Sequence, residues 1–298
     1  MSNKANTKPQ DAQDDSFDTA PVNADHADIS TGYPFIQWIT GQPALKRLHP
    51  VLGSGGFGMP VEQFVAASAD GAIPDFFTSG PIQHKSGNET DAYLTDQLSV
   101  AVLAYRFAWA TRTAGGQPQI SAEYTKGARG KLQVLVLVKG FDTLSPVMLT
   151  FSGEGSRRFY EMLKAFRQSV ITQASAIRKQ KDKSFKGFPL YTFWMLVKAG
   201  ARVEVGQPGA TSFITPPVAA WDSEGLKDTA KRADILRGLF VGKGVLAKAD
   251  ALYNEAQSWA KAWKDTIAGG NRPDTEANGD APLSDDDVPP APDEEIPY

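Results

Sequence analysis

Cysteine is absent from this chain of 298 residues, and histidine occurs only three times. Without cysteine, the chain has neither a disulfide framework nor a thiolate metal site. It also lacks any apolar run near the roughly 20 residues that span a bilayer, and its N-terminus lacks the basic-then-apolar pattern of a signal peptide. These absences predict a protein that does not bind a membrane and that lies in the cytoplasm.

The motifs of common enzyme classes are missing as well. His26, His49 and His84 stand singly, and the chain contains no H-E-x-x-H, G-x-S-x-G or G-K-[ST] pattern. The carboxylates of the middle of the chain are dispersed along the sequence. We therefore predict no catalytic residue, no cofactor and no metal site. A nuclease built from dispersed acidic residues is left as an alternative.

The stretch VLGSGGFGMP fits the G-x-G-x-x-G pattern from Gly53 to Gly58. The same pattern covers ATP phosphates in protein kinases, but kinases also need a strand lysine, an H-R-D base and a D-F-G metal ligand. The sequence carries none of these three features. We interpret the stretch as a glycine-rich turn before a short amphipathic segment. Phe57 then either stacks on a nucleic-acid base or packs inward.

Charge is unevenly distributed along the chain. Residues 1–32 carry two basic and six acidic residues, and residues 270–298 carry one basic and nine acidic residues. The middle, residues 33–269, carries 28 basic and 19 acidic residues, a net charge of +9. We predict disordered acidic tails at both ends of one folded basic domain. A basic body beside an acidic tail indicates a polyanion-binding domain with an interaction tail.

The middle of the chain mixes strand and helix patterns. Strands are predicted at residues 98–112 and within the stretch KLQVLVLVKGF, residues 131–141, and residues 147–153 are predicted to form a hairpin with the second of these. In that second strand, Leu132, Val134, Val136 and Val138 lie on one face, with Leu135 and Leu137 on the other.

A long amphipathic helix follows, with Ser156 as its candidate N-cap. Residues 190–206 are predicted to be a hairpin that turns at Ala199 and Gly200, and residues from about Ser223 are predicted to be helical. The order of elements predicts an α+β fold with antiparallel hairpins, and an OB-like barrel decorated with helices is one arrangement that satisfies it.

The last residues, LSDDDVPPAPDEEIPY, combine acidic clusters with an apolar tip. This end resembles that of bacterial and phage single-stranded DNA-binding proteins, whose acidic tails end in Ile-Pro-Phe. Tyr298 stands here in place of the phenylalanine, and VPPAP splits the acidic cluster. The resemblance is confined to the tail and implies docking on replication, recombination and repair enzymes. The residues that match the tip are Asp293, Glu294, Glu295, Ile296, Pro297 and Tyr298.

A single strand is held by cations that contact its phosphates and by aromatic rings that stack on its bases. Candidate contacts are the basic and aromatic residues that cluster on predicted strands and loops. They are Trp38, Lys46, Arg47, Phe57, Tyr105, Arg106, Arg112, Tyr124, Lys126, Arg129 and Lys131. Phe107 and Trp109 are weighed as core instead. The basic run from Ile177 to Gly187 is either a phosphate-contacting arm or a solvated helix end.

These features together predict a non-enzymatic protein that coats single-stranded DNA and recruits DNA-processing enzymes through its C-terminal tip. Such a protein would be associated with the nucleoid, and the sequence leaves homo-oligomers open. The alternative from another class is an adaptor or assembly protein of a phage or mobile element, which binds protein partners without contacting DNA.

Overall fold

The computed structural model describes eight stretches of the chain, which are residues 33–68, 71–83, 89–112, 118–121, 124–125, 128–141, 145–205 and 212–269. The strands are β1 (Phe35–Ile39), β2 (Gly56–Pro60), β3 (Thr78–Gln83), β4 (Glu89–Thr95), β5 (Gln97–Arg112), β6 (Pro118–Ser121), β7 (Arg129–Val138), β8 (Val147–Ser152), β9 (Met195–Ala199), β10 (Val203–Val205), β11 (Ser212–Ile214) and β12 (Pro217–Ala220).

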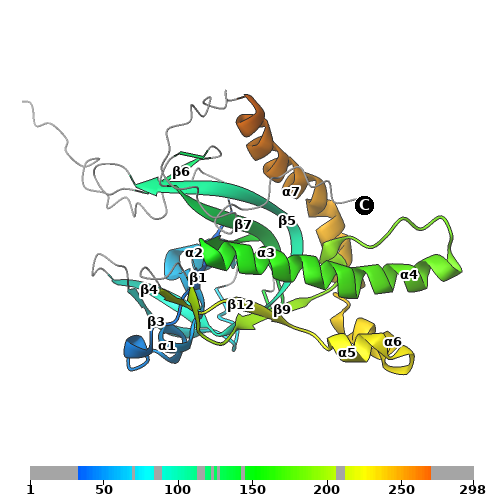
Figure 1. Cartoon of the computed structure of the whole chain (residues 1–298), viewed down its shortest axis with the longest axis horizontal. Helices are drawn as coiled ribbons and strands as arrows, with labels where there is room; N and C mark the ends of the chain where they lie inside the picture. The colour runs from blue at the N-terminus through cyan, green and yellow to red at the C-terminus, as the bar shows by residue number, and fades with distance from the viewer. Residues whose placement is uncertain are drawn as a thin grey trace, which may run out of the picture.

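The helices come in three groups along the chain (Figure 1). The short helices near the start are η2 (Pro43–Leu45), α1 (Pro50–Ser54) and α2 (Val61–Ala67). The long central helix consists of α3 (Glu154–Phe166), the π-helical turn η3 (Arg167–Ile171) and α4 (Thr172–Lys181). The last group is η4 (Leu190–Thr192), α5 (Ser223–Lys227), α6 (Thr229–Leu239) and α7 (Lys243–Gly269).

Ten strands form one large sheet in the order β12-β9-β5-β7-β8-β1-β2-β4-β3, with β6 paired to the far end of β5. All neighbours are antiparallel except β1 and β8, which are parallel. The predicted α+β class with antiparallel pairing is therefore confirmed. Within the described residues the end strands β12 and β3 do not pair, so the sheet is open and the OB-like barrel is not confirmed.

The central strands β5 and β7 separate two hydrophobic cores. On β7, Leu132, Val134, Val136 and Val138 lie in the larger core, whereas Leu135 and Leu137 lie in the second. These are the two faces predicted from the alternation along the strand. On β5 the pairing with β7 shifts between Val102 and Ala104, and Leu103 and Ala104 both face the second core. This β-bulge reverses the alternation in the second half of β5.

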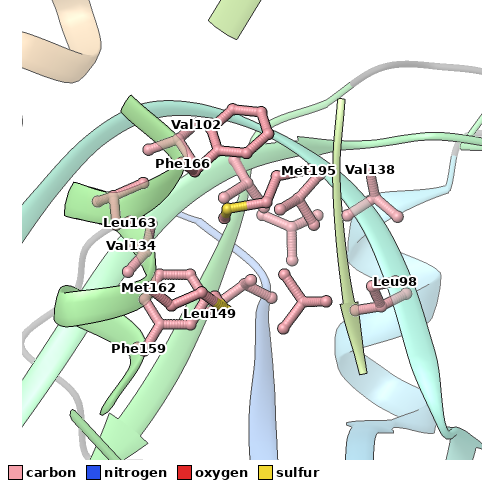
Figure 2. Packing of buried hydrophobic residues seen from close by; sticks show 14 of the residues in the cluster. Leu98, Val102, Val134, Val138, Leu149, Phe159, Met162, Leu163, Phe166 and Met195 are labelled. Atoms are coloured by element: carbon pink, nitrogen blue, oxygen red, sulfur yellow. The ribbon is translucent and has the colours of Figure 1, made fainter. Parts of the chain in front are cut away.

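The long central helix covers one face of the sheet. Phe159, Leu163 and Phe166 of α3 are buried against strand residues such as Val134 and Leu149 (Figure 2). The helix begins at Glu154 with Gly153 as its N-cap, so the predicted N-cap, Ser156, lies instead buried in the first turn. Gly153 has φ 55°, a left-handed conformation that glycine adopts more readily than serine.

Helix α7 covers the opposite face of β5. Its predicted apolar stripe is confirmed for Val245, Ala249, Leu252, Ala256 and Trp259, all of which belong to the second core. The side chains of Trp263 and Ile267, the other members of that stripe, lie outside the described residues. Hydrogen bonds from two tyrosines add to this packing beside the stripe. The Tyr33 hydroxyl donates to Glu255 at 2.6 Å, and the Tyr191 hydroxyl donates to Asp250 at 2.7 Å.

Two predicted local structures are wrong, and pairing with distant strands explains both. The glycine-rich stretch contains the end of helix α1, up to Ser54, and then strand β2, which is held between β1 and β4, so it is not a free turn. Pro60, which cannot donate to a ladder, lies beyond the last residue of β2 that pairs with β1. Residues 190–206 do not form one hairpin, because β9 pairs with β12 and β5 while β10 pairs with β11.

Candidate nucleic-acid interface

The far end of β5 and the start of β7 bring an aromatic pair to the surface. Trp109, near the end of β5, is half-buried and lies edge-to-face with Tyr124 at 4.9 Å between ring centroids. Tyr124 is 43% exposed, the largest exposure of any aromatic side chain there. An exposed ring supported from behind by a second ring has the form of a stacking platform for an unpaired base.

Cations flank this aromatic pair on the first residues of β7. Arg129 is exposed and pairs with Ala110 of β5, and Lys131 is half-buried and pairs with Ala108. Because side chains alternate along a strand, Arg129 and Lys131 lie on the face opposite Trp109. The ends of β5 and β7 therefore present an aromatic ring on one face of the sheet and positive charge on the other face. A single strand of nucleic acid that passes around the ends of these two strands would contact the ring and the cations.

Arg106 is not available to a phosphate, which corrects its prediction as a DNA contact. Its side chain is only 8% exposed and lies beneath α7. The Nε atom donates to Oε1 of Gln133 at 2.7 Å, and the guanidinium lies 4.0 Å from the ring centre of Trp259. A buried guanidinium needs such partners. Arg106 thus joins β5, β7 and α7.

Three predicted aromatic contacts belong to the packing of the larger core. Phe57 is fully buried, with its ring 4.9 Å from that of Trp38, so the alternative in which it packs inward describes the structure. Trp38 is half-buried, and its Nε1 donates to the carbonyl of Thr215 at 3.0 Å. Tyr105 packs at 5.8 Å against Tyr160 of α3. The stacking role predicted for Phe57 is withdrawn, because neither face of its ring is exposed.

Lys46 and Arg47 are exposed in the connection between η2 and α1. They lie beyond β1, which is three strands away from β5 in the sheet. At about 4.8 Å per strand, that separates β1 from β5 by about 14 Å. The structure therefore does not join these two cations to the cluster around Tyr124. The side chains of Arg112 and Lys126 and the whole C-terminal tip, residues 293–298, lie outside the described residues.

Sequence reasoning missed a shallow groove of about 340 Å³ between α3 and β12. Trp221 lies at one side of it and packs edge-to-face on Phe166 at 5.5 Å. Arg158 and Glu161 both line the groove, so their opposite charges cancel there. No sequence signal points to this groove, because its two walls are about 50 residues apart in the chain. It has no excess of positive charge to attract a phosphate.

In the part of the chain that the structure describes, no three acidic or histidine side chains gather as a metal site. No helix there is long and apolar enough to cross a membrane. In comparisons with known proteins, no family model, no curated protein and no solved structure matches the chain.

Proposed function

We propose that this chain is a single-stranded DNA-binding protein that coats the strand and recruits DNA-processing enzymes through its acidic C-terminal tip. The observation that carries the proposal is the segregation of charge: a body with a net charge of +9 precedes an acidic segment that ends in Ile296, Pro297 and Tyr298. A polyanion binds such a body, while the tail stays free for protein partners. Bound to single-stranded DNA, the chain would lie with the nucleoid in the cytoplasm.

The end of β5 and β7 supports this proposal with a suitable surface. Tyr124 supplies a ring face for one base, and Arg129 and Lys131 supply charge for the flanking phosphates. Stacking on one ring contributes about 1–3 kcal/mol per base. The OB-like barrel also belongs to the proposal, since β5 and β7 curve strongly over their length (Figure 1), as strands of small barrels do.

Binding of labelled oligo-dT, followed by fluorescence polarisation at low and moderate salt, tests the proposal. We expect tight binding to the single strand, weaker binding to a duplex of the same length, and affinity that falls steeply with salt because counterions are released. Absence of binding at low salt would reject the proposal and leave the adaptor alternative. Loss of the oligonucleotide only when a divalent metal is added would point to a nuclease.

A further inference from the structure

Helix α4 extends beyond the body of the protein (Figure 1). Its buried residues, Ala174 and Ser175, lie in its first half, and Ile177 is the last of its side chains that packs on the core. From Arg178 to Lys181 every side chain is exposed. Most helices in proteins are stabilised by packing of an apolar face. The final turn of α4 lacks such a face, so packing does not explain why the helix continues there.

Cations cover this projection. We call residues 178–186 the basic arm, and its positively charged members are Arg178, Lys179, Lys181, Lys183 and Lys186. Asp182, its one acidic residue, accepts hydrogen bonds from the backbone N–H and the hydroxyl of Ser184 at 3.1 and 2.6 Å. Those hydrogen bonds lower the pKa of Asp182 from its ordinary value. The basic arm therefore contains five positively charged side chains and only one carboxylate.

Cations of α3, α5 and α6 pair with nearby carboxylates, whereas among the described residues the exposed lysines of α7, Lys243, Lys248 and Lys261, do not. In α3, Arg157 and Arg158 bond to Glu154, and in α5 Lys227 pairs with Glu224. Lys231 and Arg237 of α6 pair with Asp228 and Asp234. Among the residues that the structure describes, none of the four lysines of the basic arm has an ion-pair partner.

The helix dipole explains only part of this charge. Cations in the last turn of a helix are stabilised by about 0.3–1 kcal/mol each, an effect that fades beyond that turn. Arg178, Lys179 and Lys181 lie in the last turn of α4, but Lys183 and Lys186 lie past the C-cap, Asp182. Their presence adds repulsion that the single carboxylate of the arm, Asp182, offsets only in part.

The segment after α4 is held in place despite its exposure. Phe185 packs on Phe188 at 4.7 Å, and Phe188 packs edge-to-face on Phe193 at 5.7 Å. The backbone N–H of Phe188 also donates to the Ser175 hydroxyl at 3.0 Å. The apolar side chains thus tie the returning chain to the body, while Lys183 and Lys186 stay exposed. A ligand would therefore meet cations whose backbone is already ordered, which lowers the entropic cost of binding.

We infer that the basic arm binds the sugar-phosphate backbone of the single strand. This inference rests on the proposed function and assigns its main electrostatic contacts to α4 and the turn after it, residues that lie outside the strands and loops of the predicted interface. Phosphates follow one another closely along a strand, and lysine contacts them as a compact point charge. The arm supplies charge without base recognition, so its contribution is independent of sequence.

The test uses the full chain and two variants with the same loss of charge. One replaces Lys179, Lys181, Lys183 and Lys186 by glutamine. The matched control replaces Lys139, Lys198, Lys227 and Lys231, which are exposed just after β7 and on β9, α5 and α6, by glutamine. Glutamine and lysine have similar helix propensities, so α4 is retained. A third variant, with only Lys183 and Lys186 replaced, leaves the helix untouched.

The readout is the affinity for labelled oligo-dT over a series of salt concentrations. For the arm variant we expect at least about a tenfold loss at ~0.1 M salt, with the slope of log affinity against log salt reduced by about 0.7 for each phosphate contact removed. The third variant should show a smaller loss of the same kind. The control should stay within about threefold of the wild type.

Three results would overturn the inference. If the arm variant and the control lose affinity equally, the arm has no special role and the proposed function stands. If the wild type fails to bind oligo-dT at low salt, both the inference and the proposed function fail. If the arm variant binds oligo-dT more tightly than the wild type, and deletion of residues 270–298 removes that difference, then the arm holds the chain's own acidic tail instead of DNA.

Discussion

Phe57 and Tyr124 show how differently the fold uses aromatic residues of similar local context. Both lie close to glycines in the sequence, and both are candidates for base stacking on sequence grounds. Phe57 points into the larger core from a strand with neighbours on both sides, and its exposed fraction is zero. Tyr124 lies outside any strand and exposes 43% of its surface. The two rings therefore have separate energetic roles.

Substitution of each ring by alanine separates these roles. Phe57→Ala should lower the free energy of unfolding by about 3–5 kcal/mol, because it opens a cavity beside Trp38 and Phe151. Tyr124→Ala should lower it by less than about 1 kcal/mol and should weaken oligo-dT binding by about 1–3 kcal/mol. Urea unfolding and fluorescence polarisation measure the two effects. A Tyr124→Ala variant with unchanged affinity would remove Tyr124 from the interface.

Glu154, the first residue of α3, gives stability that depends on pH. Burial raises the pKa of its carboxyl, but hydrogen bonds and charge from Arg157 and Arg158 outweigh burial, so the pKa lies below its ordinary value of 4.5. A lowered pKa in the folded state contributes stability above the unfolded pKa, and this stability is lost as pH falls through the folded pKa.

We therefore expect Glu154→Gln to cost about 1 kcal/mol at pH 7 and progressively less below about pH 4.5. Urea unfolding at a series of pH values between 7 and 3 gives the difference directly. The control is Glu224→Gln, whose partner Lys227 and own side chain are both largely exposed. A Glu154 difference that stays constant down to pH 3 would contradict this account.

At the scale of elements, α7 supports the irregular part of β5. The bulge between Val102 and Ala104 leaves the Leu103 carbonyl outside the regular ladder, and Nε2 of Gln257 donates to it at 3.0 Å. A buried carbonyl without a partner is costly. One helix thus covers the second core and also completes the hydrogen bonding of the central strand.

Gln257→Ala should lower the free energy of unfolding by about 1–2 kcal/mol, because the Leu103 carbonyl loses its donor. Ser258→Ala, one residue further along α7, is the control. Its exposed hydroxyl bonds only to the Asn254 carbonyl within the helix, and we expect a change below about 0.5 kcal/mol. Chemical denaturation of the two variants measures this difference in stability. Equal denaturation midpoints would refute the stabilising role of the Gln257 hydrogen bond.

The elements were predictable where their signal is local. Alternation along β7 predicted both of its faces, and helical spacing predicted α3 and the stripe of α7. Pairing between distant segments was not predictable in this way. Strand β2 needs β1 and β4 on its two sides, and β9 needs β12 from beyond the β10–β11 pair. The site was harder still, since exposure decides between Tyr124 and Phe57, and exposure follows from the whole fold.

The whole molecule divides its charge between a basic body and acidic ends. Within the described residues, the four lysines of the basic arm are exposed and have no ion-pair partner, whereas Arg157 of α3, Lys227 of α5 and Arg237 of α6 pair with carboxylates. The acidic C-terminal segment carries the opposite charge and an apolar tip. On the proposed function, the basic arm serves nucleic acid and the acidic tip serves a protein partner, and we expect mutations to separate the two roles.

Deletion of Asp293–Tyr298 should leave binding to oligo-dT unchanged or stronger, because it removes only negative charge and the apolar tip. The same deletion should abolish capture of repair enzymes in a pull-down, because the proposed function assigns the anchor to the tip. A variant with Ile296, Pro297 and Tyr298 replaced by alanine keeps the carboxylates and isolates the apolar part. Undiminished capture by the deletion variant would reject the tip as the docking element.

The bulge at Leu103 also has a consequence for the deletion of a single residue from β5. Without Leu103, the residues from Ala101 to Tyr105 would alternate regularly between the two cores, and every other side chain of β5 would keep its present face. A one-residue deletion there costs one leucine in the second core and the acceptor of Gln257. The same deletion within β7 would move every following side chain of that strand to the opposite face of the sheet. We therefore expect β5 to tolerate the loss of Leu103 better than β7 tolerates the loss of any residue within its ladder.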